Sequence, residues 1–461
     1  MLTKRTRALT LFFVWISCCC ALPAQAPQYT TFAAAQPILK VYFNSLPAEL
    51  KPNGQLSAAA WDMWVRRDDR EVRSRLERGE EDTLTNLLRL GVTYTKQQRI
   101  SFPDLERLGK DKYIDSVANR RVDDLVRALS AAKASQGMRD MRRFLEKQGF
   151  NLRTPEGQKK VKTYLLANLA RMRDEVIRAQ DELYSKKGAD LSQQFKDRGI
   201  STDSNLYPDY TIELHLRRMM KQGMLKPGSI RRVAIVGPGL DFVNKNSGSD
   251  FYPPQSTQPF AVIDTLARLG LADPATIELV TFDISSRVNE HLARARSEAA
   301  AGKWYTIQLL SSPSDLWTKD YAAGFNEYWQ KLGDQVGKPA SRIPVPEVAA
   351  GEIWNRAMSV RPAVVLRVTP VDMNVVFQRL SLPADKQFDL VIGTNIFVYY
   401  DSFQQSLARA NVAAMIKPGS YLITNEALAG SAPTGLTDSL QTNIAVSTAD
   451  TEHMYTYARP K

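Results

Sequence analysis

Residues 231–242 read RRVAIVGPGLDF, and this short stretch decides the fold. Its Val-Ala-Ile-Val run has the length and composition of a buried β-strand. The strand leads directly into Gly-Pro-Gly at 237–239. Glycine at the end of a buried strand permits a tight turn, and it lets a bound molecule approach the backbone because no Cβ stands in the way. The stretch therefore predicts a ligand site at the carboxyl end of a strand.

Four more strand-like runs follow at 277–285, 363–373, 388–400 and 420–427. Helical stretches such as PFAVIDTLARLG, SRVNEHLARARSEAA and SFQQSLARANVAAMI lie between them. Strands that alternate with helices predict an α/β fold, in which a doubly wound, mostly parallel sheet carries helices on both faces.

The end of the chain has a different pattern. Residues 442–459 read TNIAVSTADTEHMYTYAR, which gives two short strands joined by a turn, with no room for a helix between them. Antiparallel pairing is the economical solution for two such strands. The predicted sheet therefore has seven strands.

Acidic residues stand at the ends of the second and third strands. Asp283 is placed to bond both hydroxyls of a ribose, and Asp372 is placed to reach an adenine amine. The third glycine of a dinucleotide fingerprint is missing at Phe242, and the next helix begins only near Gln258. A Gly-Lys-Ser/Thr phosphate loop is also missing from the sequence. The pattern indicates an adenosine pocket for S-adenosylmethionine, which has no phosphate and needs neither feature.

At this point the chain resembles a known family. The VGPG turn, Asp283, VDM, FDLVIGTNIFVYYD and IKPGSYLITNE fall in the order of the class I S-adenosylmethionine-dependent methyltransferases. The stretch from TNIFVYYD to IKPGSYLI is similar to the chemotaxis-receptor methyltransferases. The resemblance covers residues 205–461, and it implies a Rossmann-like methyltransferase domain whose last two strands are antiparallel.

The resemblance also implies the cofactor and its contacts. Gly237 and Gly239 would pass under the methionine part of S-adenosylmethionine, and Asp283 would take the ribose hydroxyls. Asp372 and Met373 would flank the adenine. The positions carried over as cofactor-binding are Gly237, Gly239, Asp241, Asp283, Asp372, Met373 and Asn395, of which Asp241 stands where the family usually has a third glycine.

Catalytic residues are not evident in the sequence. Methyl transfer from a sulfonium needs mainly close positioning and exclusion of water, and a base only when the acceptor must lose a proton. Asn395, Tyr399 and Tyr400 are the nearest candidates, and each also fits a role as a packing residue. The methyl acceptor is not identified. The three histidines are scattered, so no zinc site is predicted.

Two insertions interrupt the predicted domain. The first, at 243–258, is rich in Gly, Ser, Asn and Pro and is predicted to be a loop that folds over the cofactor or blocks it. The second, at 303–361, contains four of the seven tryptophans. Its aromatic residues would either line a lid over the acceptor or pack a small core of their own.

The N-terminus is typical of an export signal. Residues 1–26 combine Lys4, Arg5 and Arg7 with a 15-residue apolar run at 8–22 and small residues at 24–26. A proline at position 27 is unfavourable for cleavage, so the segment is either a signal peptide or a retained anchor. All three cysteines lie within it. We expect an exported protein, periplasmic or secreted, or one tethered to the membrane by its N-terminus.

The segment between the signal and the sheet divides into a linker at 27–57 and an all-α helical domain at 58–200. Residues 27–200 carry 33 Lys and Arg against 24 Asp and Glu, whereas residues 201–461 carry 25 of each. The excess positive charge would suit an anionic partner or a membrane surface, or it is simply solvated. No nucleic-acid motif is evident.

These features predict an S-adenosylmethionine-dependent methyltransferase. The alternative is a catalytically inert binding protein, exported or associated with the bacterial envelope, that keeps the fold. The alternative arises because S-adenosylmethionine is made in the cytoplasm while the N-terminus indicates export.

Overall fold

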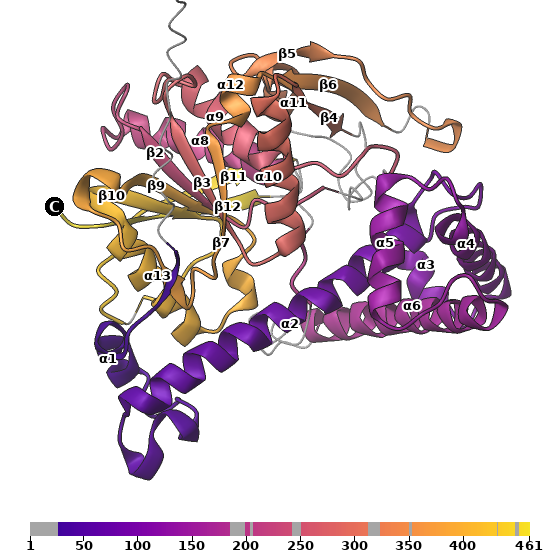
Figure 1. Cartoon of the computed structure of the whole chain (residues 1–461), viewed down its shortest axis with the longest axis horizontal. Coiled ribbons are helices and arrows are strands. Elements are labelled where there is room, and N and C mark those ends of the chain that lie inside the picture. The colour runs from indigo at the N-terminus through magenta and orange to yellow at the C-terminus, as the bar shows by residue number, and fades with distance from the viewer. Residues whose placement is uncertain are drawn as a thin grey trace, which may run out of the picture.

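The computed structural model places a twisted sheet between layers of helices, with a helical extension at one side (Figure 1). Most of the predicted signal or anchor, residues 1–25, lies outside the described residues. Within the described residues, no helix is long and apolar enough to cross a membrane. The described residues are 26–184, 199–202, 206–241, 250–311, 323–349, 353–430, 432–447 and 451–461.

The central sheet has seven strands in the order β11-β12-β10-β9-β2-β3-β7. Strand β12 pairs antiparallel with both of its neighbours, and the pairs from β10 to β7 are all parallel. The predicted α/β class and the antiparallel C-terminal pair are confirmed. The strands are β2 (Arg232–Val236), β3 (Glu278–Asp283), β7 (Val368–Asp372), β9 (Phe388–Gly393), β10 (Ile416–Thr424), β11 (Thr437–Ala445) and β12 (Thr451–Ala458).

Strand order reverses beside β2. The chain runs from β2 outward through β3 to β7, and then returns to β9 on the other side of β2. In open parallel sheets, ligands bind at the carboxyl ends of the strands where the order reverses in this way.

One face of the sheet is covered by three helices and the other by helices from both halves of the chain. The first face buries an apolar core under α8 (Tyr207–Lys221), α9 (Gln258–Arg268) and α10 (Ser286–Ala300). The second face is covered by α13 (Ser402–Met415) and by residues before position 80.

The segment predicted as a linker is part of this second face. Helix α1 (Phe32–Val41) and the first half of α2 (Ala58–Leu90) pack in the same core as α13. The indole of Trp64 lies edge-on to Phe377, with ring centroids 5.7 Å apart. The short strand β1 (Gln28–Tyr29) pairs with β8 (Gln378–Arg379). The segment therefore covers apolar surface that the C-terminal half cannot bury by itself.

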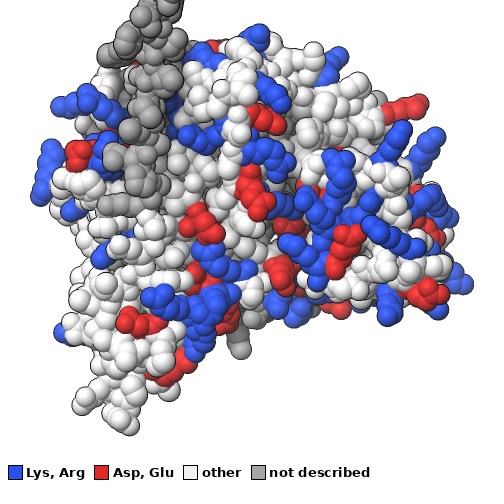
Figure 2. All heavy atoms as spheres, in the orientation of Figure 1, with Lys and Arg blue, Asp and Glu red and all other residues white. Residues whose placement is uncertain are grey.

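The second half of α2 belongs to a different core. It packs with α3 (Phe102–Arg107), α4 (Lys112–Ser130), α5 (Gln136–Lys147) and α6 (Pro155–Tyr184), which we call the helical unit. Since α2 contributes to both cores, the packing places the start of this unit within α2 and not at residue 58. Figure 2 shows basic side chains spread over the unit with acidic ones among them.

The second insertion forms a three-stranded antiparallel sheet in the order β4-β6-β5. Its aliphatic and aromatic side chains join the core on the α8 and α9 face. The sequence left two alternatives for this insertion, a lid over the acceptor or a packed core. The described residues fit the packed core. Its elements are β4 (Tyr305–Ser311), α11 (Ala323–Lys331), β5 (Gly337–Ala340) and β6 (Trp354–Val360), followed by α12 (Pro362–Val365).

Candidate functional site

A cavity of about 320 Å³ opens at the carboxyl ends of β2, β3, β7 and β9. This volume is within the range of small-molecule sites. The cavity lies at the reversal point of the sheet, where the sequence predicted it. Its lining includes Leu76, Ile200, Ser201, Thr202, Pro208, Gly237, Gly239, Gln258, Asp283, Ile284, Met373, Asn374, Val375, Thr394, Asn395, Ile396 and Tyr399.

The glycine turn after β2 forms one wall. Both Gly237 and Gly239 have positive φ, at 65° and 71°. The Gly237 amide donates to the carbonyl of Phe282 at 2.8 Å. A Cβ at Gly237 would lie 2.1 Å from Cδ1 of Ile396. The fold itself therefore requires glycine at position 237, because of the positive φ and because a side chain would clash with Ile396. This requirement holds whether or not a ligand is bound.

Asp283, at the end of β3, is the buried acid of the cavity. Only 7% of the residue is exposed, and one carboxyl oxygen accepts a hydrogen bond from the Ser285 amide at 2.8 Å. Burial raises the pKa of the Asp283 carboxyl to about 7, while the amides of Ser285 and Gly239 oppose the shift. A carboxyl with this pKa exchanges its proton near neutrality, so a ligand that donates hydrogen bonds to it favours the charged form.

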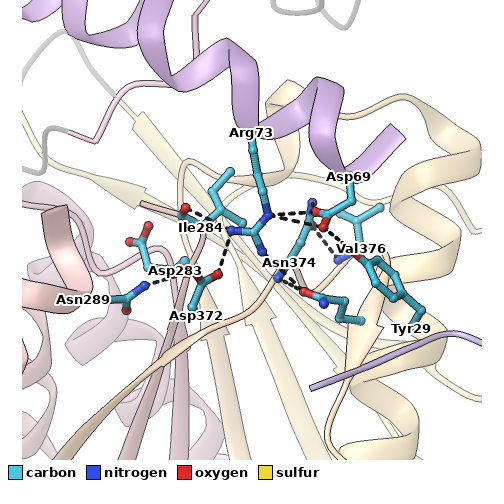
Figure 3. A network of polar contacts seen from close by, with 10 residues as sticks. Tyr29, Asp69, Arg73, Asp283, Ile284, Asn289, Asp372, Asn374 and Val376 are labelled. Carbon is cyan, nitrogen blue, oxygen red and sulfur yellow. Dashed lines mark hydrogen bonds and ion pairs between the residues drawn. The ribbon is translucent and has the colours of Figure 1, made fainter. Parts of the chain in front are cut away.

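Asp372 lies beside Asp283 on the neighbouring strand but does not line the cavity. Its carboxylate pairs with Arg73 of α2 at 2.7 Å, and more than half of the side chain is exposed (Figure 3). Its predicted contact with a bound adenine stays a prediction, since here the carboxylate is taken up by Arg73. The adjacent Met373 lines the cavity, and its predicted contact with an adenine stays a prediction.

Arg73 makes two further polar contacts beside the cavity. It donates to the carbonyl of Ile284 at 3.3 Å and pairs with the almost fully buried Asp69 at 3.3 Å. Asp69 in turn accepts hydrogen bonds from Asn374 at 2.9 Å and from the Tyr29 hydroxyl at 2.7 Å (Figure 3). Helix α2 is therefore fixed to the loop after β7 by a continuous polar network.

The middle of α2 and the segment 199–202 form a roof over the cavity. The Ile200 amide donates to the carbonyl of Arg75, and the Leu240 amide donates to the carbonyl of Thr202 at 2.7 Å. A Cβ at Gly79 would lie 2.0 Å from the carbonyl oxygen of Ile200, so glycine is required where the two backbones meet. Since Leu76, Ile200 and Thr202 line the cavity, a ligand inside it would be covered from the N-terminal half.

Asn395 lines the cavity after β9. It is one of only two non-glycine residues with positive φ in the described part of the chain. Among the other candidates, the Tyr399 hydroxyl accepts a hydrogen bond from the Ser201 amide at 3.4 Å. Tyr400 also lines the cavity but is buried, and burial raises the pKa of its phenol.

Asp241, which was predicted to bind the cofactor, contacts residues of the first insertion. Its backbone pairs with Gln255, and its carboxylate accepts a hydrogen bond from the Thr257 hydroxyl at 3.2 Å. Residues 242–249 lie outside the described residues, so the predicted cover or block by this loop is not visible. The end of the insertion does reach the cavity, because Gln258 lines it and donates to the Thr394 hydroxyl at 3.1 Å.

No described residue of the second insertion lines the cavity. Trp304 lies against Lys338 at the surface, and Trp354 is also exposed. Trp317 lies outside the described residues. A lid of tryptophans over the cavity is therefore not seen in the part of the insertion that the structure describes.

The histidines have structural roles where they are buried. His215 lies between the hydroxyls of Thr442 and Thr456, and burial lowers the pKa of its imidazole to about 4. His291 contacts the Tyr305 hydroxyl at 2.8 Å. Across the described ranges, no group of three His, Cys, Asp or Glu residues could hold a metal ion.

The sequence did not indicate that the roof residues, Pro208 and Gln258 would line the cavity. The one available signal for the roof was Gly79, a glycine in the middle of a long helical pattern, which usually has a packing reason. No sequence signal connected Ile200 to a cavity formed by strands that follow it.

The comparisons with known proteins add a distant structural likeness. No protein-family model matches the sequence, and no curated protein matches it either. The N-methyltransferase NodS of Bradyrhizobium japonicum, in complex with S-adenosyl-L-homocysteine, is similar over 61% of this chain and 98% of its own, with 12% identity and a TM-score of 0.26.

Two further solved structures give the same kind of match. Magnesium protoporphyrin IX methyltransferase of Synechocystis, with bound SAM, covers 62% of this chain and 97% of its own, with 12% identity and a TM-score of 0.26. A TehB-like SAM-dependent methyltransferase of Corynebacterium glutamicum covers 55% and 100%, with 8% identity and a TM-score of 0.24. These likenesses are too distant to assign a function.

Proposed function

We propose that this chain binds S-adenosylmethionine in the cavity at the carboxyl ends of β2, β3 and β9 and catalyses methyl transfer. The observation that carries the proposal is Asp283, a buried carboxyl at the end of β3 whose pKa is near 7. Two neighbouring hydroxyls of a ribose are suitable donors to such a carboxylate.

The other walls of the cavity suit the remaining parts of this ligand. Ile284, Met373 and Val375 supply an apolar surface beside Asp283, which fits a flat adenine. The turn at Gly237 and Gly239 would hold the methionine part, and Asn395 would lie at the reacting end. When bound, S-adenosylmethionine supplies a methyl group on a positively charged sulfur.

The chain's own residues contribute positioning and exclusion of water. The roof of Leu76 and Ile200 covers the cavity from above, and it is fixed through Arg75 and the polar network of Arg73. A covered cavity keeps water from the reacting centre, and a fixed one holds the reactants near contact distance. These two effects are what methyl transfer chiefly requires.

Calorimetry of the full chain tests the proposal. We expect S-adenosylmethionine and S-adenosylhomocysteine to bind, and Asp283→Ala to weaken both by about 10- to 100-fold, the scale of a lost charge-assisted hydrogen bond. A matched control is Asp273→Ala, in an exposed turn before β3. Binding that Asp283→Ala leaves unchanged would refute the ribose assignment.

The same experiment addresses the inert alternative. If S-adenosylmethionine binds but is never demethylated in the presence of a broad set of acceptors, the chain is a binding protein that keeps the fold. If neither compound binds, both forms of the proposal fail.

A further inference from the structure

A groove at the edge of the sheet lies apart from the candidate site. It has a volume of about 350 Å³, and its walls are the C-terminal half of α8 and the last residues of β11. Pro208, at the start of α8, lines the candidate cavity, whereas Lys221, at the end of the same helix, lines this groove. The helical rise between these two residues is about 20 Å, so the groove is a separate site.

Strand β11 is the last strand of the sheet on this side. Among the described residues, it pairs with β12 alone. Successive residues of an antiparallel strand direct their amides and carbonyls alternately to the two sides, so half of these groups on β11 point away from β12. A row of donors and acceptors of this kind can pair with another extended chain.

Features that protect an edge strand are confined to the start of β11. The pairing with β12 shifts register between Asp438 and Leu440, and Asp438 is the one charged residue of the strand. Residues 440–445 read LQTNIA, pair with β12 in regular register and contain no lysine, proline or acid. The groove is formed by residues 442–445 of this second part. Pairing with a further strand is therefore not opposed there.

The wall beside this edge is basic. Leu214, Arg217, Arg218 and Lys221 line the groove, and their spacing of three and four places them on one stripe along α8. The three cations are exposed. Arg217 pairs with the buried Glu213 at 2.7 Å, whereas Arg218 and Lys221 make no ion pair within the described part of the chain. The stripe therefore has a surplus of positive charge.

The helix dipole explains the cations but not the groove. Arg218 and Lys221 lie in the last turn of α8, where positive charge interacts favourably with the dipole. That effect needs no strand beside it. Here the stripe does lie beside β11, because the Thr442 hydroxyl is 3.0 Å from Nδ1 of His215 and Ile444 lies in the core under α8. Side chains of an added strand that point to this face would lie against the stripe.

We propose that β11 and the basic stripe of α8 form a docking site for an extended acidic peptide of a partner protein. The peptide adds a strand beside residues 440–445, and acids at every second position contact Arg217, Arg218 and Lys221. Backbone pairing supplies affinity, and the charges select the partner. The proposal is independent of methyl transfer, because the groove and the cavity share no lining residue.

Two other occupants fit the groove less well. In a symmetric dimer joined through β11, both α8 helices lie on the same face of the joined sheet, so the two basic stripes would approach and repel each other. A nucleic acid gains affinity by neutralising many phosphates, and it has no peptide backbone to pair with the strand edge. The acidic peptide uses both the edge and the charge.

A fluorescent peptide in which glutamate and valine alternate is the probe. We expect it to bind the full chain, as measured by fluorescence anisotropy. Its affinity should fall at least about tenfold in the double variant Arg218→Glu with Lys221→Glu, because attraction becomes repulsion. The matched control is Arg294→Glu with Lys303→Glu, which reverses two exposed cations that do not line the groove. Circular dichroism verifies the folding of both variants.

N-methylation of the probe tests strand pairing separately from charge and needs no variant of the protein. Two peptides carry N-methyl groups on alternate amides, one in each of the two possible phases. In an added strand, the amides of one phase point to β11 and those of the other point away from it. Only one of the two peptides should therefore lose affinity, by at least about tenfold.

Several results would overturn the proposal. A failure of the acidic peptide to bind, or equal binding of the two methylated peptides, would exclude an added strand. Single-stranded oligothymidylate that binds more tightly than the peptide, and is lost in the charge-reversed variant, would assign the groove to a nucleic acid. A stable dimer in gel filtration that does not bind the peptide would assign the edge to a second copy of the chain.

Discussion

A nitrogen of Arg73 lies 2.7 Å from a carboxylate oxygen of Asp372, and the two residues are 299 positions apart in the sequence. This pair joins the N-terminal helix α2 to the strand edge that carries the candidate site. The pair also engages the carboxylate of Asp372, which the strand pattern predicted to contact a ligand. The relation between these residues therefore changes the expected effects of substitutions at the site.

Asp372→Asn should have only a small effect. The pair is largely exposed on the Asp372 side, so we expect the free energy of unfolding to fall by less than about 1 kcal/mol and cofactor affinity to change less than about threefold. Arg73→Met should cost more, about 1–3 kcal/mol, because Asp69 is almost fully buried. Urea unfolding measures both, with the exposed Arg70→Met on the same helix as control. Loss of cofactor binding in Asp372→Asn alone would restore the original assignment.

Asp283 should make ligand binding and stability depend on pH in opposite directions. Its carboxyl must be charged to accept hydrogen bonds from the ribose, so affinity should rise as pH increases through about 7 and level off above it. Calorimetry between pH 5.5 and 8.5 gives this profile, and an affinity that is flat over the range would contradict it.

Without ligand the same group destabilises the fold. The folded pKa of Asp283 is raised above the value of about 3.9 in an unfolded chain, so the folded state binds more protons between these values and stability falls as pH rises from 4 to 7. Asp283→Asn should therefore raise the free energy of unfolding by about 1–3 kcal/mol at pH 8. The gain should vanish near pH 4, and thermal unfolding at the two pH values measures it.

Gly79→Ala should displace the roof. The added Cβ would meet the backbone oxygen of Ile200 at 2.0 Å, and backbone cannot rotate away as a side chain can. We expect cofactor affinity to fall about three- to tenfold, roughly 1 kcal/mol, with the sheet intact by circular dichroism. Ser74→Ala, at an exposed site on the same helix, is the control. Unchanged affinity would mean that the roof does not contribute to binding.

The fragment 205–461 should fail to fold as a soluble domain. It lacks α1 and the first half of α2, so the apolar surface that Trp61, Trp64 and Leu39 cover on α13 and its neighbours would be exposed. A chain of residues 27–461 should be soluble. Circular dichroism and gel filtration compare the folding and the solubility of the two chains. A soluble, folded 205–461 fragment would support the boundary expected from sequence.

A C-terminal reporter should decide the location of the chain. The basic and apolar segments at 1–26 lead us to propose export, so fused alkaline phosphatase should be active and a fluorescent protein that folds only in the cytoplasm should be dark. The opposite pattern would place the cavity beside the cell's supply of S-adenosylmethionine. It would also favour the methyltransferase over the inert alternative.

The sequence by itself determined the sheet, its direction and the place of the cavity. These follow from local signals, because the apolar run before Gly237 and the alternation of strands and helices are written in neighbouring residues. The same signals located Asp283, Met373 and Asn395 at strand ends. Carboxyl ends of parallel strands meet at one edge, so strand-end residues come together whatever the details of packing.

Tertiary structure alone decided what closes the cavity and which acids face it. Leu76, Ile200 and Gln258 line it because segments distant in sequence fold across the strand ends, and no local pattern encodes such a contact. Asp372 is paired by an arginine 299 residues away, whereas Asp283 on the neighbouring strand is buried and lines the cavity. Local sequence gives the position of a carboxyl on a strand, but its charge state depends on burial and on neighbours that only the folded chain supplies.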